Sequence, residues 1–456
     1  MEACFAVSKN FGIGVNNKIP WHIPEDLEFF KRLTLNNVII MGKNTWRSLP
    51  KRPLSNRINI IITNTIPTEQ YPTNVIFTSL ENLQNHLSIF PHLKHIFIGG
   101  AHLFHSLQQY IHTIHITYID SVVECDVFLP KISNHFFLSE FSTNYYSESL
   151  KCNFRFLKFL KSSPILHDET YLDLANKIIH TKSNIRIDRT NTGTLSLFGD
   201  QIQFDISKSV PVLTTKRIPW KSCIEELLWF LRGDTNAQNL KNKNVNIWNG
   251  NSSRSFLDNV GLNHLKEGDC GANYSFQWRF FGQTYQNSES SYEMYTSDDQ
   301  INNVYNLLLN DPYSRRIFLS AWNPSDLSKT VLPPCHVSAQ FYVDHENGLS
   351  CHMYQRSCDV FLGLPWNILS YSILTYILAK KCNMSPKKLI ISFGDVHIYS
   401  NHIDQMKTQL SRNHLAYPVL ELNDSIIDTN FEDLTIDQFD LVGYFPHPSI
   451  KGVMSV

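Results

Sequence analysis

The clearest candidate for a reactive side chain in this chain of 456 residues is Cys335, in the segment LPPCH at 332–336. A thiolate is a soft nucleophile, and a neighbouring arginine lowers the pKa of a thiol so that thiolate exists at neutral pH. Arg356, in YQRSCDVFLGLPWN at 354–367, is a candidate for that positive charge. An arbitrary cysteine is more often buried and inert, and we interpret Cys358 in that way. Cys335 is therefore the candidate nucleophile.

A carboxylate near the N-terminus is a second candidate. In the segment GIGVNNKIPWHIPEDLEFFKRLT, Asp26 follows Trp21 and shares a helical face with Phe29 and Phe30. Burial among apolar groups raises the pKa of a carboxyl, which could then help to protonate a bound heterocycle. For any single acid in this segment the simpler interpretation is a solvated helix start, where the helix dipole favours negative charge.

Two strand–glycine–helix turns, VIIMGKNTW at 38–46 and IFIGGAHLF at 96–104, are candidates for binding phosphate. Free N–H groups and the dipole at a helix start favour an anion. Each turn alone is a weak signal, because glycine often serves only as a tight turn. Together, in one small domain, they could hold the diphosphate of a dinucleotide. There is no Walker motif and no GxGxxG, so neither a P-loop nor a Rossmann site is indicated.

The elements that must position these residues differ between the two parts of the chain. Short β-rich runs alternate with helical runs in the first part, which predicts an α/β fold with a mostly parallel sheet flanked by helices. The expected strands are 4–8, 37–42, 58–63, 74–77, 95–100, 113–120 and 153–160, and the expected helices are 24–34, 43–49, 80–87 and 101–110.

The second part is richer in long helices, which predicts an α+β domain. The expected helices are 169–179, 222–233 and 364–382, with extended runs at 336–344 and 349–357. Between the two parts, LKSSPILHDE contains a Ser-Ser-Pro break, the best linker candidate. We therefore expect domains at 1–160 and 168–456, joined by a short linker at 161–167.

Length and composition exclude several classes of protein. A chain of 456 residues is too long for one compact core, and 42% apolar with 18% charged residues is a globular composition. Lys plus Arg number 40 against 41 for Asp plus Glu, which argues against a nucleic-acid binder that works by bulk charge. Apolar runs are too short for a membrane span, and the N-terminal residues do not predict a signal peptide.

The nine cysteines and 19 histidines have no spacing typical of a disulfide framework or a metal site. The cysteine number is odd, and neither CxxC nor HExxH occurs. This pattern predicts reduced thiols in the cytoplasm rather than disulfides, and it predicts no metal.

Residues 1–160 resemble dihydrofolate reductase. The segments IGVNNKIPW, PEDLEFFKRLT, MGKNTWRSL, RPLSNRINIIIT and IGGAHLF occur in the order and spacing of that family. The resemblance implies reduction of dihydrofolate with NADPH, with Asp26 holding the pterin and Thr117 hydrogen-bonding nearby. The other implied folate contacts are Leu27, Phe30, Leu54 and Arg57. The implied NADPH contacts are Ala6, Ile13, Gly14, Lys43, Asn44, Thr45, Thr63, Gly99 and Gly100.

Residues from about 168 to 456 resemble thymidylate synthase. The resemblance rests on DRTNTGT, EELLWFLRGDTN, IWNGNSSRSFL, QWRFFG, SRRIFLSAWNP, LPPCH, YQRSCDVFLGLPWN and FGDVHIYSNH. It implies that Cys335 adds to carbon 6 of the uracil in dUMP. Methylenetetrahydrofolate would then supply both the carbon and the hydride, which leaves dihydrofolate. The implied proton-transfer residues are Glu226 and Tyr274, with His336 near the nucleophile.

The same resemblance implies the substrate contacts. Arg189, Arg356 and Ser357 would hold the dUMP phosphate, with Arg315 and Arg316 reaching from a partner subunit, so a homodimer is expected. The remaining implied dUMP contacts are Asn367 at the uracil, His397 and Tyr399 at the ribose, and Asp359. The implied folate contacts are Trp248, Asn251, Leu332, Asp359, Gly363 and the terminal Val456. Trp366 stands where the family usually has Phe, and we expect this to be tolerated because both side chains are flat and apolar.

Two other functions stay open at this point. In a pyrimidine hydroxymethylase, water rather than hydride would add to the same covalent intermediate. Trp248 and the attached reductase argue against it, and Asn367 argues against dCMP as the substrate. A non-enzymatic scaffold or RNA-binding module with decayed sites is the other alternative. The intact set of Asp26, Cys335 and the binding residues argues against it, and no nucleic-acid partner is required.

Overall fold

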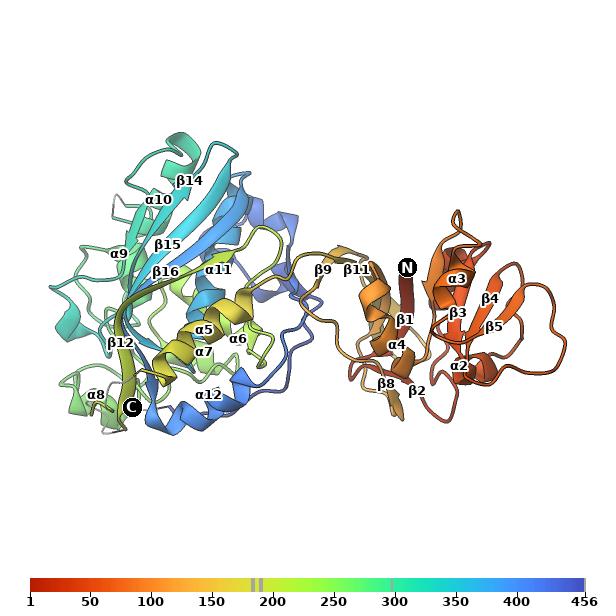
Figure 1. Cartoon of the computed structure of the whole chain (residues 1–456). Coiled ribbons are helices and arrows are strands. Elements are labelled where there is room, and N and C mark those ends of the chain that lie inside the picture. Colours follow the sequence, from red (N-terminus) through yellow and green to blue (C-terminus); the bar gives the residue numbers. More distant parts are fainter. Residues whose placement is uncertain (182–184, 188–191, 297, 455–456) are drawn as a thin grey trace. The chain divides into compact units, whose positions relative to one another are not determined.

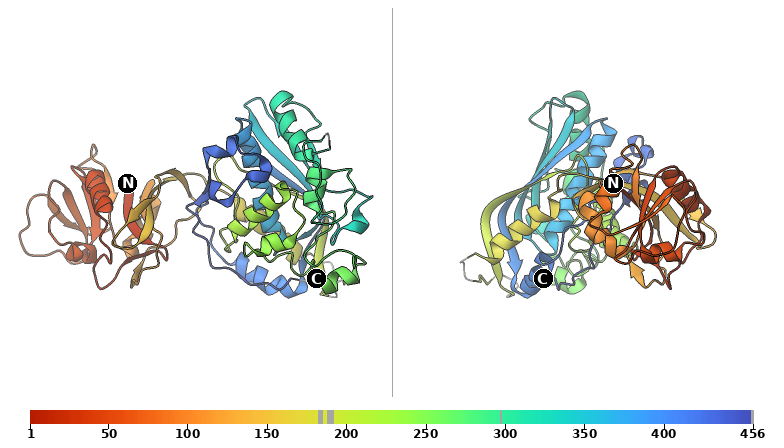
Figure 2. Two further views of the ribbon diagram at one scale, coloured as in Figure 1. Left: turned by 180° about the vertical axis from the view of Figure 1, so that it is seen from behind. Right: turned by 45° about the vertical axis from the view of Figure 1, so that its right-hand side comes forward.

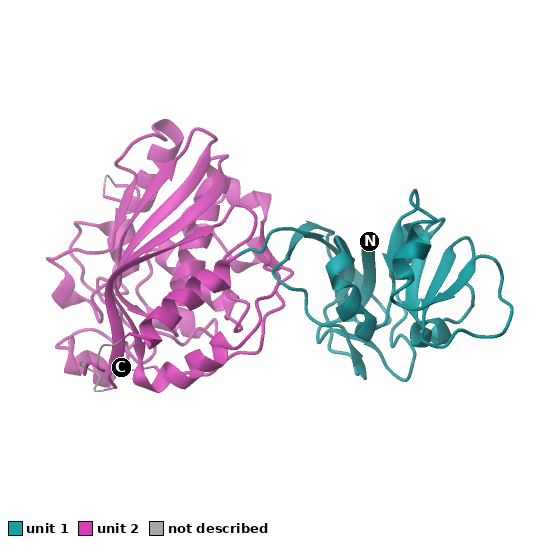
Figure 3. Cartoon of the chain, in the orientation of Figure 1, with its two compact units in different colours: residues 1–165 teal, residues 166–456 magenta. Residues whose placement is uncertain are grey.

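The computed structural model of the chain describes residues 1–181, 185–187, 192–296 and 298–454 (Figure 1). The chain divides into two compact units, residues 1–165 and 166–456 (Figure 3). Each unit has its own sheet and its own buried core.

Unit 1 is an α/β unit around a mostly parallel sheet, as the sequence predicted. The strand order is β10-β11-β7-β1-β6-β3-β4-β5, with β9 beside β11, and only the pairings of β11 are antiparallel. The strands are β1 Glu2–Ser8, β3 Val38–Gly42, β4 Ile58–Ile62, β5 Val75–Thr78, β6 His95–Phe97, β7 Thr113–Ile119, β9 Phe136–Phe141, β10 Tyr145–Ser147 and β11 Cys152–Lys161. A separate pair joins β2 Gly12–Gly14 to β8 Val127–Phe128.

The central strands of this sheet are apolar along their whole length because both of their faces are covered. Every residue of β3, VIIMG, is buried, and so are four of the five residues of β4, INIII. Strands buried on both faces have this continuous apolar sequence. The helices are α1 Pro24–Thr34, α2 Lys43–Ser48, α3 Leu83–Leu87 and α4 Ala101–Leu107. The helix expected at 80–87 is shorter than predicted, and the one at 101–110 ends in a 3₁₀ turn, Gln108–Tyr110.

Unit 2 is an α+β unit. In the described part of this unit, one sheet has the order β12-β16-β15-β14-β13, and β15 and β16 are its parallel pair. The strands are β12 Thr194–Asp205, β13 Phe318–Ser320, β14 His336–Val343, β15 Gly348–Asp359 and β16 Ser385–Tyr399, with a small pair β17 Val419–Leu422 and β18 Phe439–Val442. The helices are α5 His167–Ile179, α6 Trp220–Leu231, α7 Ala237–Lys241, α8 Arg254–Asn259, α9 Tyr274–Phe280, α10 Gln300–Asn310, α11 Gly363–Lys381 and α12 Ile403–Leu410.

The long helix α11 organises the core of unit 2. It packs on β15 and β16 with one side and on α6 with another (Figures 1 and 2). Because it is covered nearly all round, its sequence GLPWNILSYSILTYILAKK is apolar on every side rather than on one stripe. The elements that carry Cys335, Arg356, Asn367 and Glu226 therefore share one core.

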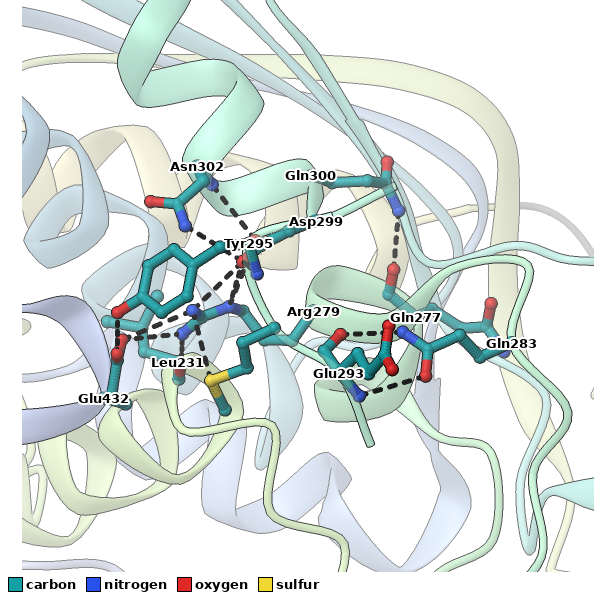
Figure 4. Close-up of polar contacts among 11 residues, drawn as sticks. Leu231, Gln277, Arg279, Gln283, Glu293, Tyr295, Asp299, Gln300, Asn302 and Glu432 are labelled. Atoms are coloured by element: carbon teal, nitrogen blue, oxygen red, sulfur yellow. Dashed lines mark hydrogen bonds and ion pairs between the residues drawn. The ribbon is translucent and has the colours of Figure 1, made fainter. Parts of the chain in front are cut away.

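A buried cation ties four segments of unit 2 together (Figure 4). The Arg279 guanidinium in α9 is fully buried and lies 3.1 Å from Asp299. It donates to the carbonyl of Leu231 and, at 3.3 Å, to Glu432, which also accepts from the Tyr295 hydroxyl. A buried charge is stable only when it is paired and hydrogen-bonded, and this network supplies both.

We expect Arg279→Met to destabilise unit 2 strongly. Methionine keeps most of the apolar stem but leaves Asp299 buried without its counter-charge, which costs about 3–5 kcal/mol. The matched control is Lys266→Met, which removes the cation of an exposed pair with Glu289 and should cost at most about 1 kcal/mol. Thermal unfolding should show a midpoint lower by on the order of 10 °C for Arg279→Met. Equal midpoints for the two variants would contradict the structural role of Arg279.

Within the described residues, no helix combines the length and apolarity needed to cross a membrane. All nine cysteines are free. In the same part of the chain, no group of three His, Cys, Asp or Glu side chains is arranged to hold a metal ion.

Candidate active sites

The carboxylate candidate of unit 1 lies where a helix start meets the sheet. Pro24 occupies the first turn of α1, where its missing N–H costs nothing. Asp26 follows in that turn and accepts a hydrogen bond of 2.6 Å from the Thr117 hydroxyl of β7. In the register of β1 and β7, Ala6 stands directly opposite Thr117. Burial raises the pKa of Asp26, and the Thr117 hydroxyl lowers it in part.

The expected folate contacts of unit 1 lie in α1, the helix that carries Asp26, and in the segment before β4. Leu27 is exposed, and Phe30 and Leu54 are half-buried, so apolar surface is available to a ligand. Arg57 is buried and donates from Nε to Thr34 at 2.9 Å and from Nη1 to the carbonyl of Ser55 at 2.7 Å. These bonds fix the guanidinium, which suits recognition of a carboxylate.

The two glycine turns lie side by side. Strands β3 and β6 are parallel neighbours, so both turns stand at the carboxyl edge of the sheet, where α/β proteins bind their ligands. Gly42 N–H donates to the Gly99 carbonyl at 2.9 Å. Gly99 has φ +137°, and a Cβ there would stand 2.9 Å from the Thr45 hydroxyl, so this position needs glycine. The two turns that we expect to bind the diphosphate are therefore adjacent.

The remaining expected cofactor residues border this edge. Lys43 and Asn44 open α2 directly after β3, and Thr63 follows β4, the next strand of the sheet. Gly100 precedes α4. Ile13 and Gly14 lie in β2, which pairs with β8 apart from the main sheet.

The thiol candidate of unit 2 lies immediately before β14. Its backbone N–H donates to the Tyr274 hydroxyl at 2.7 Å. The Tyr274 ring stacks on His336, with centroids 3.9 Å apart and planes 8° apart. His336 Nδ1 lies 2.8 Å from the Tyr371 hydroxyl, and burial lowers the pKa of His336 to about 3, so its imidazole is neutral. Cys335 thus has a phenol and a neutral imidazole beside it.

Arg356, a residue of β15, hydrogen-bonds to the same segment. Its N–H donates to the Cys335 carbonyl at 2.9 Å. Its guanidinium donates to the carbonyls of Pro334 and Pro333 at 2.8 and 2.7 Å. The arginine and the cysteine that the sequence suggested as partners therefore belong to one local structure, although 21 positions separate them in the sequence.

The ladder between β15 and β16 brings the expected nucleotide contacts together. Ser357 stands opposite Asp395, and Asp359 stands opposite His397. His397 Nδ1 lies 2.9 Å from Asp395, and the His397 and Tyr399 rings are 5.1 Å apart. Residues two apart on a strand share a face, so this signal would have pointed to Asp395, which sequence reasoning missed.

The uracil candidate Asn367 lies in the first turns of α11. Its Oδ1 accepts from Gln355 Nε2 at 2.9 Å. This bond orients the amide, because the partner nitrogen of Gln355 can only donate. Gln355 was not predicted, and its position one residue before Arg356 gave no separate signal.

Glu226 of α6 is held between two tryptophans. The Trp248 indole donates to Oε1 at 2.7 Å, and the Trp366 indole donates to Oε2 at 2.6 Å. Burial raises the pKa of Glu226 to about 7, against the two indole N–H groups, which lower it. The interpretation of Trp366 as a flat apolar replacement for Phe was incomplete, because its N–H contacts a buried carboxylate.

The residues expected on the folate side come from several segments of unit 2. Trp248 and Asn251 are buried, Leu332 is half-buried, and Gly363 opens α11. Asp359 Oδ1 accepts from Phe361 N–H at 2.9 Å. The Val453 carbonyl of the C-terminal tail lies 2.9 Å from His402 Nε2, and His402 Nδ1 lies 4.0 Å from Asp359. Two expected contacts, Arg189 and Val456, lie outside the described residues. Arg315 and Arg316 are exposed, just before β13.

Each of the two units is similar to a known family of enzymes. A family model described as dihydrofolate reductase matches residues 1–161, and one described as thymidylate synthase matches residues 169–456. The chain is 40% identical to the bifunctional dihydrofolate reductase-thymidylate synthase of Paramecium tetraurelia, covering 99% of this chain and 98% of the relative. It is 39% identical to that of Zea mays, over 100% and 96%, and 36% identical to that of Leishmania major, over 99% and 94%.

The chain therefore combines a reductase and a methyltransferase. It belongs to the family of bifunctional dihydrofolate reductase–thymidylate synthases. It is an enzyme of thymidylate and folate metabolism. The synthase converts dUMP to dTMP with methylenetetrahydrofolate and releases dihydrofolate, which the reductase returns to tetrahydrofolate with NADPH.

Proposed function

We propose that Cys335 is the nucleophile that adds to carbon 6 of dUMP. The supporting observation is that the backbone of Cys335 hydrogen-bonds to the Tyr274 hydroxyl and to the Arg356 N–H. These three residues come from separate segments of the chain. In this mechanism Tyr274, which bonds to Cys335 and stacks on the neutral His336, helps to remove the proton from carbon 5, and Glu226 organises the proton transfers. Arg356 supplies positive charge to the thiolate and to the phosphate.

The dUMP site is built on the strand ladder next to this cysteine. Ser357 and Arg356 hold the phosphate with Arg189, His397 and Tyr399 bind the ribose, and Asn367 reads the uracil. A site that pairs both the carbonyl and the N–H of uracil rejects cytosine, because buried groups would lose their partners. On the folate side, Trp248, Asn251, Leu332, Asp359 and Gly363 line the pterin site, and the C-terminal residue Val456 closes it.

In the reductase, Asp26 holds the pterin and promotes its protonation, with Thr117 as its hydrogen-bond partner. A carboxyl with a raised pKa keeps its proton at higher pH than an ordinary aspartate, which suits this task. Arg57 pairs with the glutamate carboxylate of folate. The turns at Gly42 and at Gly99 hold the NADPH diphosphate. We assign the reductase to residues 1–160 and the synthase to 168–456, with 161–167 between them.

The synthase works as a homodimer in this proposal, because Arg315 and Arg316 cannot serve their own subunit's cysteine. Arg315 and Arg316 lie in the turn before β13, whose first residue, Phe318, pairs with Gln340, five residues along β14 from Cys335. At about 3.3 Å per residue, these five residues span roughly 17 Å. The arginines therefore serve the phosphate of a partner subunit.

An exposed aromatic face supports this dimer. Phe318, Tyr342 and Tyr354 are 49%, 66% and 42% exposed, and the strand registers put them on the same side of the sheet. Large apolar side chains gathered on an open face are typical of a protein interface. A cytoplasmic location fits the nine free cysteines.

Covalent trapping tests the proposed nucleophile. A dUMP that carries fluorine on carbon 5 cannot lose that substituent as a proton, so the adduct with enzyme and methylenetetrahydrofolate should stall before release. Mass spectrometry of the digested adduct should find the nucleotide on the peptide that contains Cys335. In the control reaction without methylenetetrahydrofolate, this adduct should be absent. A nucleotide attached to another cysteine would refute the assignment.

A further inference from the structure

The carboxylate of Glu226 has each of its oxygens occupied by a tryptophan from a different segment. Trp248 precedes α8, whereas Trp366 lies in α11, which packs on the helix that carries Glu226. The Trp366 bond, at 2.6 Å, is the shorter of the two. Only 7% of Glu226 is exposed, so solvent cannot replace either donor.

We propose that the Trp366 indole N–H holds the second oxygen of Glu226 and favours its ionised form, so that Trp366 is a positioning residue of the synthase reaction. This inference rests on the proposed role of Glu226 in proton transfer. An indole N–H donates and never accepts. It therefore stabilises a carboxylate and gains nothing from a protonated carboxyl, whose own O–H needs an acceptor.

In the surroundings of Glu226, the two indole donors are the groups that favour its ionised form. The titratable groups that interact with it electrostatically are Cys223, Cys270 and Tyr274, and burial raises the pKa of each, so all three are uncharged at neutral pH. The other elements packed on α6 carry charges that are engaged elsewhere or exposed. Glu432 bonds to Arg279 and Tyr295 (Figure 4), and Asp433, Asp437 and Lys241 are exposed.

Among the described residues, no cation thus opposes the effect of burial on Glu226, whose pKa is raised to about 7 even with both indoles in place. Removing one donor leaves burial less opposed, so the pKa rises further. A charge-assisted hydrogen bond is strong enough to move a pKa by about one unit. At the pH where half of the wild-type Glu226 is ionised, about one tenth would then be ionised.

The test compares synthase kcat between pH 5 and pH 9 in three variants. In Trp366→Phe, the limb of the profile that belongs to Glu226 should move to higher pH by about one unit, with the dUMP KM little changed. Glu226→Gln identifies that limb by removing it. Trp220→Phe is the matched control: it deletes an indole six residues before Glu226, on a different side of α6, and should keep the wild-type limb.

The outcomes separate the inference from the role on which it rests. A wild-type profile in Trp366→Phe, with the limb lost in Glu226→Gln, overturns the inference alone. A limb that persists in Glu226→Gln overturns both the inference and the role of Glu226. Reductase activity of each preparation reports the amount of intact chain.

A second measurement does not depend on Trp366→Phe folding. Indole ¹⁵N–¹H NMR of the wild type should show two N–H signals that move together as Glu226 ionises, one from Trp248 and one from Trp366. Both should stay fixed in Glu226→Gln. One moving signal instead of two overturns the inference.

Discussion

Cys335→Ser is expected to abolish dTMP formation, by roughly 10⁴-fold or more, because a serine hydroxyl stays protonated and is a poor nucleophile toward an unactivated uracil. The Tyr274 contact is made by the backbone of residue 335 and survives the change, so the site keeps its shape. Reduction of dihydrofolate should stay within about twofold of wild type, because the reductase site is independent of this residue. Absorbance assays of dihydrofolate formation and of NADPH oxidation measure the two activities separately.

Asp26→Asn is the reciprocal variant. Asparagine preserves the size of the side chain and its contact with Thr117, but it cannot carry the proton-promoting carboxyl. Reductase activity should fall by roughly 10²- to 10³-fold, and most severely at high pH, where dihydrofolate is seldom protonated in solution. Synthase activity should be retained. If either change removed both activities from folded protein, the model of two separate sites would be wrong.

Mixed dimers should recover synthase activity that neither parent has. We expect Cys335→Ser and Arg315→Ala to be inactive, or nearly so, as homodimers. In a heterodimer, the chain with Cys335→Ser offers an intact Arg315 to the intact Cys335 of its partner, so one site is wild-type and the other collects both lesions. Unfolding and refolding the variants together should restore up to about half of the activity per heterodimer if the sites act independently.

The physical basis of this prediction is the separation along β14. The Gln340 side chain donates to the Arg315 carbonyl, and Gln340 lies five residues along β14 from Cys335, roughly 17 Å by strand rise, which exceeds the reach of an arginine side chain. Mixing the folded variants without subunit exchange is the control and should restore nothing. If co-refolded samples stayed inactive while heterodimers were shown to form, Arg315 would act within its own subunit and the shared site would be refuted.

Local sequence patterns were enough to predict much of the fold. The β-rich runs at 37–42 and 58–63 predicted the strands β3 and β4, and the alternation of strands with short helices predicted the mostly parallel sheet. Hydrophobic periodicity predicted the ends of the helices less accurately than it predicted that the helices exist. The helix expected at 80–87 starts only at Leu83, because a periodic pattern does not specify where hydrogen bonding begins.

The candidate site residues were found because their types and their neighbours in the sequence carry chemistry. Cys335, Asp26 and Asn367 belong to motifs with a definite order and spacing, and motif order is a property of the chain alone. The residues that orient them carry no such signal. Tyr371 bonds to His336, Gln355 bonds to Asn367, and both lie among ordinary helix or strand residues.

The sequence by itself determined that this chain has a reductase part and a synthase part, and it predicted the side chains that we propose for the chemistry. Only the tertiary structure decided the environment of those side chains. Trp366 illustrates the difference, because a sequence records an aromatic residue but not the direction of its N–H. That direction follows from the packing of α11 on α6, which brings the indole within 2.6 Å of Glu226. Hydrogen bonds and burial depend on distances between segments that are remote in the sequence, and folding alone sets those distances.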